Sequence, residues 1–418
     1  MERAHADLTT FLSENIFKTH ILKKGAIHFS SVSRGLIGQL FNNISRAERA
    51  YQSEELPVVL LDIKRDGLPQ GQSYTYCEKP IRDEIESKSR SGYQYKFQIN
   101  HRGFNVSIIS PDKSENVRSY MSKAIKNIYM LLHVVCQYAK PNCSEQMNIY
   151  IYLTGLHKML PKENNDTISK VHANTAFTSS CKTQTEILVF RREEWFKTLA
   201  HESCHSLGLD FSAYDNYLIN KEMFTMFPVN TEFKLYESYC EMWGEIMAIL
   251  FNIYRHVRHN TKLEDVERKL PTMIKSVETA ITREVYYSLF QVSKILSHYG
   301  LTYEELIKDN RGHKGCNYKE NTPVLSYFVI KSILMFNIDY FMQWCIHNNG
   351  SSISFTNMVE NDDIQAKMKR YCNIARQHYK DPAYIDALTQ VQEIYKDIKP
   401  TRKNLYILEN LRMTITEY

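Results

Sequence analysis

The sequence predicts an α+β protein in which a small mixed sheet and one buried helix form the functional core, followed by a mainly helical C-terminal half. Short segments rich in β-forming residues are concentrated before about residue 190. Apolar residues recur at helical spacing from about residue 232 onward. Between these regions lies His201-Glu202-Ser203-Cys204-His205, two histidines spaced for one face of a helix.

The composition is that of a globular protein. The chain has 418 residues, of which 43% are apolar and 24% charged, enough for one large domain or two or three smaller ones. The net charge of +5 is mild, so we expect no nucleic-acid partner, since such binding usually requires a dense basic face. Nine cysteines occur without a CxxC pair, which predicts free thiols in a reducing compartment and hence a cytoplasmic location.

Neither a signal peptide nor a membrane span is expected. The first residues, MERAHADLTTFLSENIF, lack the apolar core of a signal peptide. The most apolar long run, Leu325 to Trp344, contains Lys331 and Asp339. A buried helix explains such a run better than a membrane-spanning segment.

The first half alternates helices and strands. Residues 1–55 are expected to be helical, with Leu36, Leu40 and Ile44 at helical spacing. Strand-like and helical stretches then follow in order: a strand over 56–63, a hairpin of 95–99 and 104–108 around His101-Arg102-Gly103, a helix over 116–139, and strands over 147–154, 171–178 and 186–190.

The second half is expected to be almost entirely helical. Its predicted helices cover 232–256, 263–298, 302–309, 322–347 and 360–397. The tail from Pro400 is expected to form a peripheral strand or an extended arm. The predicted organisation is an N-terminal α/β region over 1–93, a catalytic core over 94–260, a helical subdomain over 261–399 and a tail over 400–418.

The histidine motif predicts a metal site. Residues i and i+4 of a helix lie about 40° apart around its axis, so His201 and His205 face the same way and supply half of a tetrahedral zinc site. Glu202 is then placed to accept a proton from a metal-activated water. A preceding strand, an apolar helix side and a glycine stop at Gly208 favour this interpretation. The alternative is a buried helix with two hydrogen-bonded core histidines.

A catalytic zinc site needs a third protein ligand. Glu237, Glu241 and Glu245 recur every four residues on an otherwise apolar helix, and buried carboxylates are costly unless paired or bound to metal. A solvated acidic face is the alternative. In the pattern HExxHxxGxxH the third ligand would be Phe211, with Asp210 one residue early, which disfavours that arrangement. A thiolate ligand from Cys204 is the least favoured option, because buried cysteines usually serve packing.

The chain resembles the gluzincin-type zincin metallopeptidases in three neighbouring segments: the strand over 186–190, EEWFKTLAHESCHSLGLDFS and ESYCEMWGEI. More narrowly, these segments resemble the metallopeptidases predicted for large nucleocytoplasmic DNA viruses. The resemblance covers about residues 145–250. It implies a zincin-like core with Zn²⁺ held by His201, His205 and Glu237, and Glu202 as general base. Glu241 is the rival third ligand, since EMWG resembles the E-x-W-A of some gluzincins. Otherwise Glu241 orients a histidine ligand.

The resemblance implies a zinc-dependent peptidase acting on a protein or peptide. In zincins, an edge strand before the active helix binds extended substrate, which predicts substrate contacts at Asn174, Ala176 and Phe177. An ordinary hairpin strand is the alternative there. Tyr327 is a candidate to stabilise the oxyanion, although a core role fits its buried helix better. The competing function is a catalytically silent zincin-fold structural or interaction protein, such as a virion component, and a viral origin would place the chain in the host cytoplasm or the virion.

Overall fold

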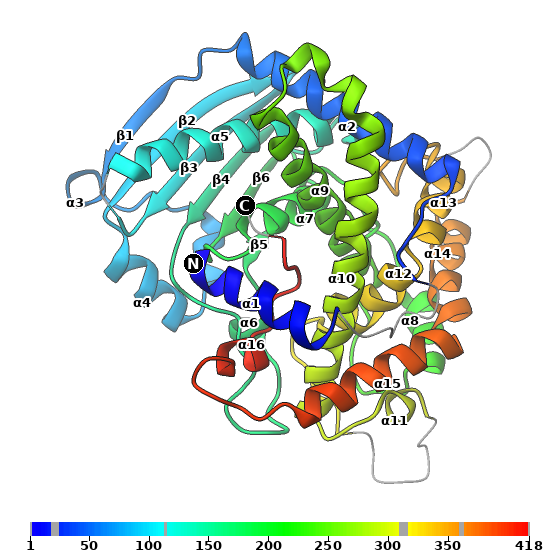
Figure 1. The fold of residues 1–418 in the computed structure, drawn as a ribbon. Coiled ribbons are helices and arrows are strands. Elements are labelled where there is room, and N and C mark those ends of the chain that lie inside the picture. The colour runs from blue at the N-terminus through cyan, green and yellow to red at the C-terminus, as the bar shows by residue number, and fades with distance from the viewer. Residues whose placement is uncertain (1, 18–24, 113–114, 309–316, 359–362, 417–418) are drawn as a thin grey trace.

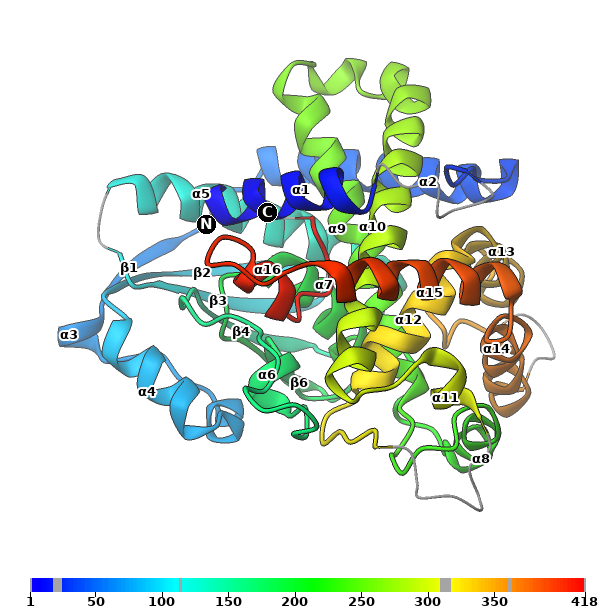
Figure 2. The same cartoon turned by 60° about the horizontal axis from the view of Figure 1, so that its bottom comes forward.

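The structure is a computed structural model that describes residues 2–17, 25–112, 115–308, 317–358 and 363–416. It confirms the predicted α+β class, with a mixed sheet in the N-terminal half and a largely helical C-terminal half. The sheet occupies one side of the molecule and the helices from α10 to α15 the other (Figures 1 and 2).

Six strands form the sheet. They are β1 (Val58–Asp62), β2 (Ser91–Ile99), β3 (Arg102–Ser110), β4 (Gln146–Tyr152), β5 (Ala176–Thr178) and β6 (Gln184–Val189). Their order is β1-β2-β3-β4-β6-β5, with β3, β4 and β6 parallel and the outer pairings antiparallel. The predicted hairpin is confirmed as β2 and β3, in which Phe97 pairs with Phe104. Residue 93, the expected end of the N-terminal region, lies within β2.

The helices of the first half lie between and around the strands in sequence. They are α1 (Glu2–Asn15), α2 (Ser31–Gln52), α3 (Ile63–Asp66), α4 (Lys79–Lys88), α5 (Glu115–Val135), α6 (Lys170–Ala173) and α7 (Trp195–Ser206). Helix α5 is the crossover between the parallel strands β3 and β4, as such a connection requires.

The helices of the second half include the two longest of the described chain, α9 and α10. They are α8 (Tyr217–Met226), α9 (Leu235–His259), α10 (Leu270–His298), α11 (Tyr303–Ile307), α12 (Lys331–Phe336), α13 (Ile338–Asn349), α14 (Ile364–His378), α15 (Pro382–Asp397) and α16 (Leu405–Glu409). The single helix expected over 322–347 is a π-helical turn at Leu325–Ile330 followed by α12 and α13, which are separated at Asn337. The helix expected over 360–397 is interrupted by Asp381, which caps α15, and by Pro382, which begins it.

Each face of the sheet packs against a different set of helices. Met147, Ile149 and Ile151 of β4 face the main core, which includes α5, α7 and α9. Tyr152 at the end of β4 belongs to a smaller cluster on the other face, with Ile81 and Ile85 of α4. This alternation is the period of two expected for a strand covered on both faces.

Two sequence-based expectations are wrong. Cys143 and Cys181 form a disulfide between residues 38 apart in sequence, so the cysteines are not all free thiols. The tail from Pro400 is not peripheral, because residues 410–414 are buried and cross the middle of the molecule (red in Figure 1). We refer to residues 410–416 as the C-terminal segment.

No single helix in the described part of the chain is long and apolar enough to cross a membrane. The stretch Leu325–Phe336 with Ile338–Asn349 reaches that length and composition only as a pair bent by 91°.

Candidate metal centre

Helix α7 carries the histidine motif in the interior of the protein. All twelve of its residues, Trp195 to Ser206, are buried. It ends as predicted at Gly208, whose φ of +66° favours glycine and whose backbone N–H donates to the carbonyl of His205. Helix α7 therefore presents its motif at a fixed angle between the sheet and α9.

Three ligand atoms meet at one point. Nε2 of His201 lies 3.2 Å from Nε2 of His205, and Oε2 of Glu237 lies 3.2 Å and 3.3 Å from these two nitrogens. Glu237 stands on the first turn of α9 and is mostly buried. The structure thus brings together a His201, His205 and Glu237 group that could hold a metal ion.

The spacing of these atoms fits a tetrahedral cation. Zinc–ligand bonds of about 2.0–2.1 Å at tetrahedral angles separate neighbouring ligand atoms by ~3.3 Å. The observed separations of 3.2–3.3 Å match this value. The negative charge of Glu237 can be balanced at this point by protons on the two imidazoles or by a metal cation, and the tetrahedral spacing fits the metal cation.

A carboxylate contacts the other nitrogen of each histidine. Nδ1 of His201 lies 2.8 Å from Oε1 of Glu241 on α9. Nδ1 of His205 is hydrogen-bonded to Asp210, which follows α7. For His205, an Nδ1–H donated to Asp210 fixes the tautomer that leaves Nε2 free for a metal and makes the imidazole a stronger donor. Glu241 makes a charged contact with the Nδ1 side of His201, whereas Glu237 faces both Nε2 atoms.

The charges around the two imidazoles are strongly anionic. Although burial opposes protonation, the charges of Glu241 and Glu237 raise the pKa of His201 to about 9. Asp210 and Glu237 likewise outweigh burial and raise the pKa of His205. Burial raises the pKa of Glu237, but the two histidines outweigh it and lower that pKa to about 2. Such a site favours positive charge at the point where the ligands meet.

Buried ion pairs hold the carboxylates of α9 in place. Lys197 of α7 pairs with Glu241, and Lys331 of α12 pairs with Glu245 at 2.8 Å. Gly244 permits the close approach of α7 and α9, because a Cβ there would lie 3.1 Å from the carbonyl of Lys197 and 3.3 Å from Cβ of His201. The three glutamates of α9 therefore face different partners. Glu237 faces the point where the ligand atoms meet, and Glu241 contacts His201 and Lys197. Glu245 pairs with Lys331.

A cavity of about 190 Å³ opens in front of the three ligand atoms. Glu202 lines it, and no hydrogen bond or ion pair engages the Glu202 carboxylate within the described part of the chain. Tyr327 also lines it, with its ring centroid 6.1 Å from that of His201. The structure thus places Tyr327 on the cavity wall as well as in the core.

The three residues expected to contact substrate all line this cavity. They are Asn174, Ala176 and Phe177. Ala176 and Phe177 lie on β5, which is the last strand of the sheet and pairs antiparallel with β6. The predicted strand is shorter than expected, because residues 170–173 form α6, in which Ser169 and His172 make a capping box.

The other residues considered as ligands, Phe211 and Cys204, make different contacts. Phe211 is fully buried among aromatic rings, including Phe355 with centroids 4.3 Å apart. The Cys204 thiol donates to the carbonyl of Ala200, 3.5 Å away, within α7. Asp210, Cys240 and Nδ1 of His205 form a second group of metal-binding types, but the same Nδ1 is already hydrogen-bonded to Asp210.

Sequence reasoning missed several residues at the site. Tyr236 lines the cavity, with its ring centroid 6.0 Å from that of His205. Lys197 also lies at the site, and its position four residues before His201, on the same face of α7, is the signal that could have found it. No local pattern points to Met413, which reaches Lys197 from the C-terminal segment.

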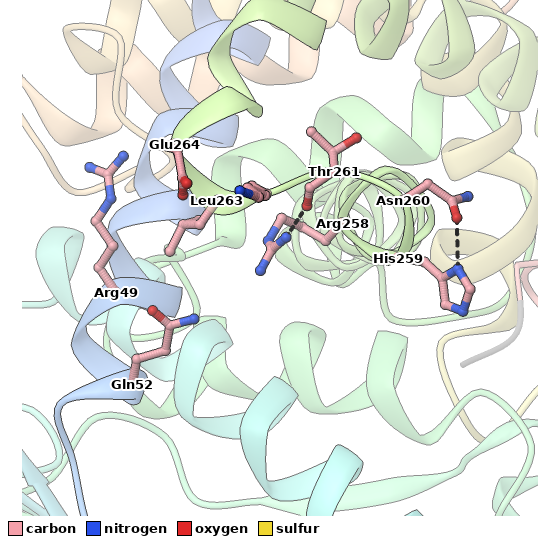
Figure 3. Close-up of a pocket in the computed structure, with 9 residues that line it drawn as sticks. Arg49, Gln52, Arg258, His259, Asn260, Thr261, Leu263 and Glu264 are labelled. Atoms are coloured by element: carbon pink, nitrogen blue, oxygen red, sulfur yellow. Dashed lines mark hydrogen bonds between the residues drawn. The ribbon is translucent and has the colours of Figure 1, made fainter.

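A larger cavity, about 720 Å³, lies elsewhere, where the end of α9 approaches α2 (Figure 3). Its cationic side chains include Arg49, Arg258 and Lys262. The Arg258 guanidinium is already engaged by Glu48 and by the carbonyl of Thr261. This larger cavity shares no lining residue with the cavity at the metal centre.

Comparisons with known proteins show one distant similarity. The chain resembles the "Uncharacterized protein R210" of Acanthamoeba polyphaga mimivirus, with 22% identity over 294 residues, covering 67% of this chain and 71% of that protein. No protein-family model matches the chain, and no solved structure matches it. The chain is thus distantly similar to a viral protein whose name states no function.

Proposed function

We propose that this protein is a zinc-dependent metallopeptidase of the gluzincin type that hydrolyses peptide bonds with Glu202 as the general base. One observation carries the proposal. Two histidines and a glutamate converge at tetrahedral spacing on a cavity in which the neighbouring Glu202 has no partner among the described residues. A structural zinc site is closed by four protein ligands, whereas a catalytic site keeps a position open.

The chain's own residues would divide the work as follows. His201, His205 and Glu237 would hold the ion, while Glu241 and Asp210 keep the imidazoles oriented. When bound, zinc supplies Lewis-acid chemistry, acidifying water and polarising a carbonyl. Glu202 would accept the proton of the attacking water on a carboxylate oxygen and pass it to the leaving amine. Burial raises the pKa of Glu202, which strengthens it as a base.

Tyr327 would stabilise the negative charge that develops on the substrate carbonyl oxygen. Burial raises the pKa of the Tyr327 hydroxyl well above its usual value, so the group remains a neutral donor. That hydroxyl has no hydrogen-bond partner within the described ranges, and the residue lines the cavity beside Glu202. A positioned donor of this kind lowers the barrier of acyl transfer.

An extended peptide would bind along β5. This strand ends the sheet, so its outer backbone groups can add a strand of substrate, with Asn174, Ala176 and Phe177 at the contact. The substrate would then be an unfolded or flexible protein segment. The similarity to a mimivirus protein supports a location in the host cytoplasm or in a virion.

The second candidate function is a zincin-fold structural or interaction protein, for example a virion component, that retains the metal without catalysis. The two proposals make different predictions for peptide hydrolysis by the variant Glu202→Gln. Under the peptidase proposal, this variant keeps its zinc and its fold but loses at least about 10²-fold in peptide hydrolysis, since a general base contributes 10²–10⁴.

Zinc content and cleavage of a peptide library, measured on the same preparations, test this expectation. Glu304→Gln, an exposed residue of α11, is the matched control and should keep full activity. Zinc-loaded wild type that cleaves no peptide would contradict the peptidase proposal and favour the structural one.

A further inference from the structure

A second, smaller cavity of about 20 Å³ adjoins the cavity at the metal centre, and we call it the side extension. Five residues line both spaces: Asn174, Ala176, His201, Glu202 and Tyr327. A peptide whose reacting bond lay beside Glu202 would therefore have one flanking side chain close to the extension. About 10–15 Å³ is needed to hold a single water molecule, so there is room for little more than a methyl group.

The C-terminal segment forms part of the wall of this extension. Met413 lines it together with Lys158, Lys197 and Thr198. Sδ of Met413 lies 3.6 Å from Nζ of Lys197. Met413 thus lies against Lys197 and Thr198 of α7, although it is more than 200 positions away in sequence.

The backbone of Met413 is fixed on both sides. Its N–H donates to Oε1 of Glu194 at 2.6 Å, and its carbonyl accepts from Nζ of Lys331 at 2.6 Å. Glu194 also pairs with Lys158 at 2.7 Å, and both side chains are almost fully buried. Because removing one partner of a buried ion pair is costly, the backbone of Met413 and the Lys158 side chain cannot leave this wall without breaking these contacts.

We infer that Met413 is a specificity-determining residue, which restricts one substrate position beside the scissile bond to glycine, alanine or serine. This inference rests on the proposed peptidase function, and it names the substrate class of that site. A larger side chain there would have to displace Met413 or break the ion pairs of Lys158 and Lys197. Replacing Met413 by a smaller residue should enlarge the extension and admit larger side chains.

The test uses a degenerate peptide library and the full chain with zinc, and the residues on both sides of each cleaved bond are identified by mass spectrometry. Wild type should cleave where one flanking residue is glycine, alanine or serine. In Met413→Ala, the ratio of kcat/KM for leucine over alanine at that position should rise at least about tenfold, because even one methylene is worth 10–200-fold in a fitted pocket.

The matched control is Met342→Ala, which removes a buried methionine of α13 outside the cavity and should lower stability without changing the ratio. Wild type that cleaves beside leucine as readily as beside alanine would overturn the inference. An unchanged ratio in a folded Met413→Ala would do the same.

A binding measurement separates this inference from the proposed function. Labelled peptides that differ only at the restricted position are titrated into zinc-loaded Glu202→Gln, with and without Met413→Ala. Tighter binding of the peptides with small residues, with a smaller preference in Met413→Ala, supports the inference even if wild type cleaves nothing. The absence of cleavage would then count against the peptidase proposal alone. Equal binding of all peptides contradicts the inference.

Discussion

At the scale of single residues, the candidate metal centre depends on carboxylates that contact the imidazoles on Nδ1, the nitrogen of each ring that faces away from the point where the ligand atoms meet. Glu241 does this for His201 and Asp210 for His205. Both are acids that sequence reasoning considered as possible direct ligands. Spacing alone placed Glu237 and Glu241 on one helical face, and only the approach of α9 to α7 assigns a different atom of His201 to each.

Glu241→Gln should weaken zinc binding about 10–100-fold, the usual effect of losing an outer carboxylate. The amide keeps the shape but loses the charge that orients His201. Competition with a chromogenic chelator measures the affinity. Glu245→Gln, one turn further along α9 and paired with Lys331, is the matched control. Equal losses in both variants would show that general destabilisation, and not the contact with His201, governs zinc affinity.

At the scale of elements, the sequence predicted well those parts that carry their own periodicity. The hairpin β2–β3, the helix α5 and the long helix α9 lie close to their expected bounds, because apolar spacing and turn residues are local. Residues 171–178 were harder, since the capping box at Ser169 and His172 turns the first three residues of the expected strand into part of α6.

Gly244 links helix packing to the metal site. Alanine normally stabilises a helix interior by about 1 kcal/mol relative to glycine. At Gly244 a Cβ would lie 3.1 Å from the carbonyl of Lys197, so the facing turn of α7, which carries His201, must give way by a few tenths of an ångström. Gly244→Ala should therefore give no gain in stability and should weaken zinc binding several-fold.

The control for this prediction is Gly35→Ala in α2, where a Cβ meets nothing within 4 Å. This variant should raise the free energy of unfolding by about 0.5–1 kcal/mol. Urea denaturation and zinc titration compare the two. If Gly244→Ala were as stabilising as Gly35→Ala, with unchanged zinc affinity, the close approach of α7 and α9 would not matter for the site.

At the scale of the whole molecule, the features that could not be predicted are those that join distant parts of the chain. The Cys143–Cys181 disulfide has no marker in the sequence, because cysteine spacing does not report spatial approach. The burial of residues 410–414 depends on partners such as Glu194, Glu284 and Lys331, each on a different element. The mixed composition of the tail gave no sign of these partners, and the tail was expected to be a peripheral strand or an extended arm.

The proposed function requires that His201, His205 and Glu237 hold a cation. Anomalous diffraction at the zinc edge, from crystals grown with zinc, tests this requirement most directly. We expect one strong peak about 2.0–2.2 Å from both Nε2 atoms and from a carboxylate oxygen of Glu237. A peak at Nδ1 of His205 beside Asp210 and Cys240, or no peak at either group, would contradict it.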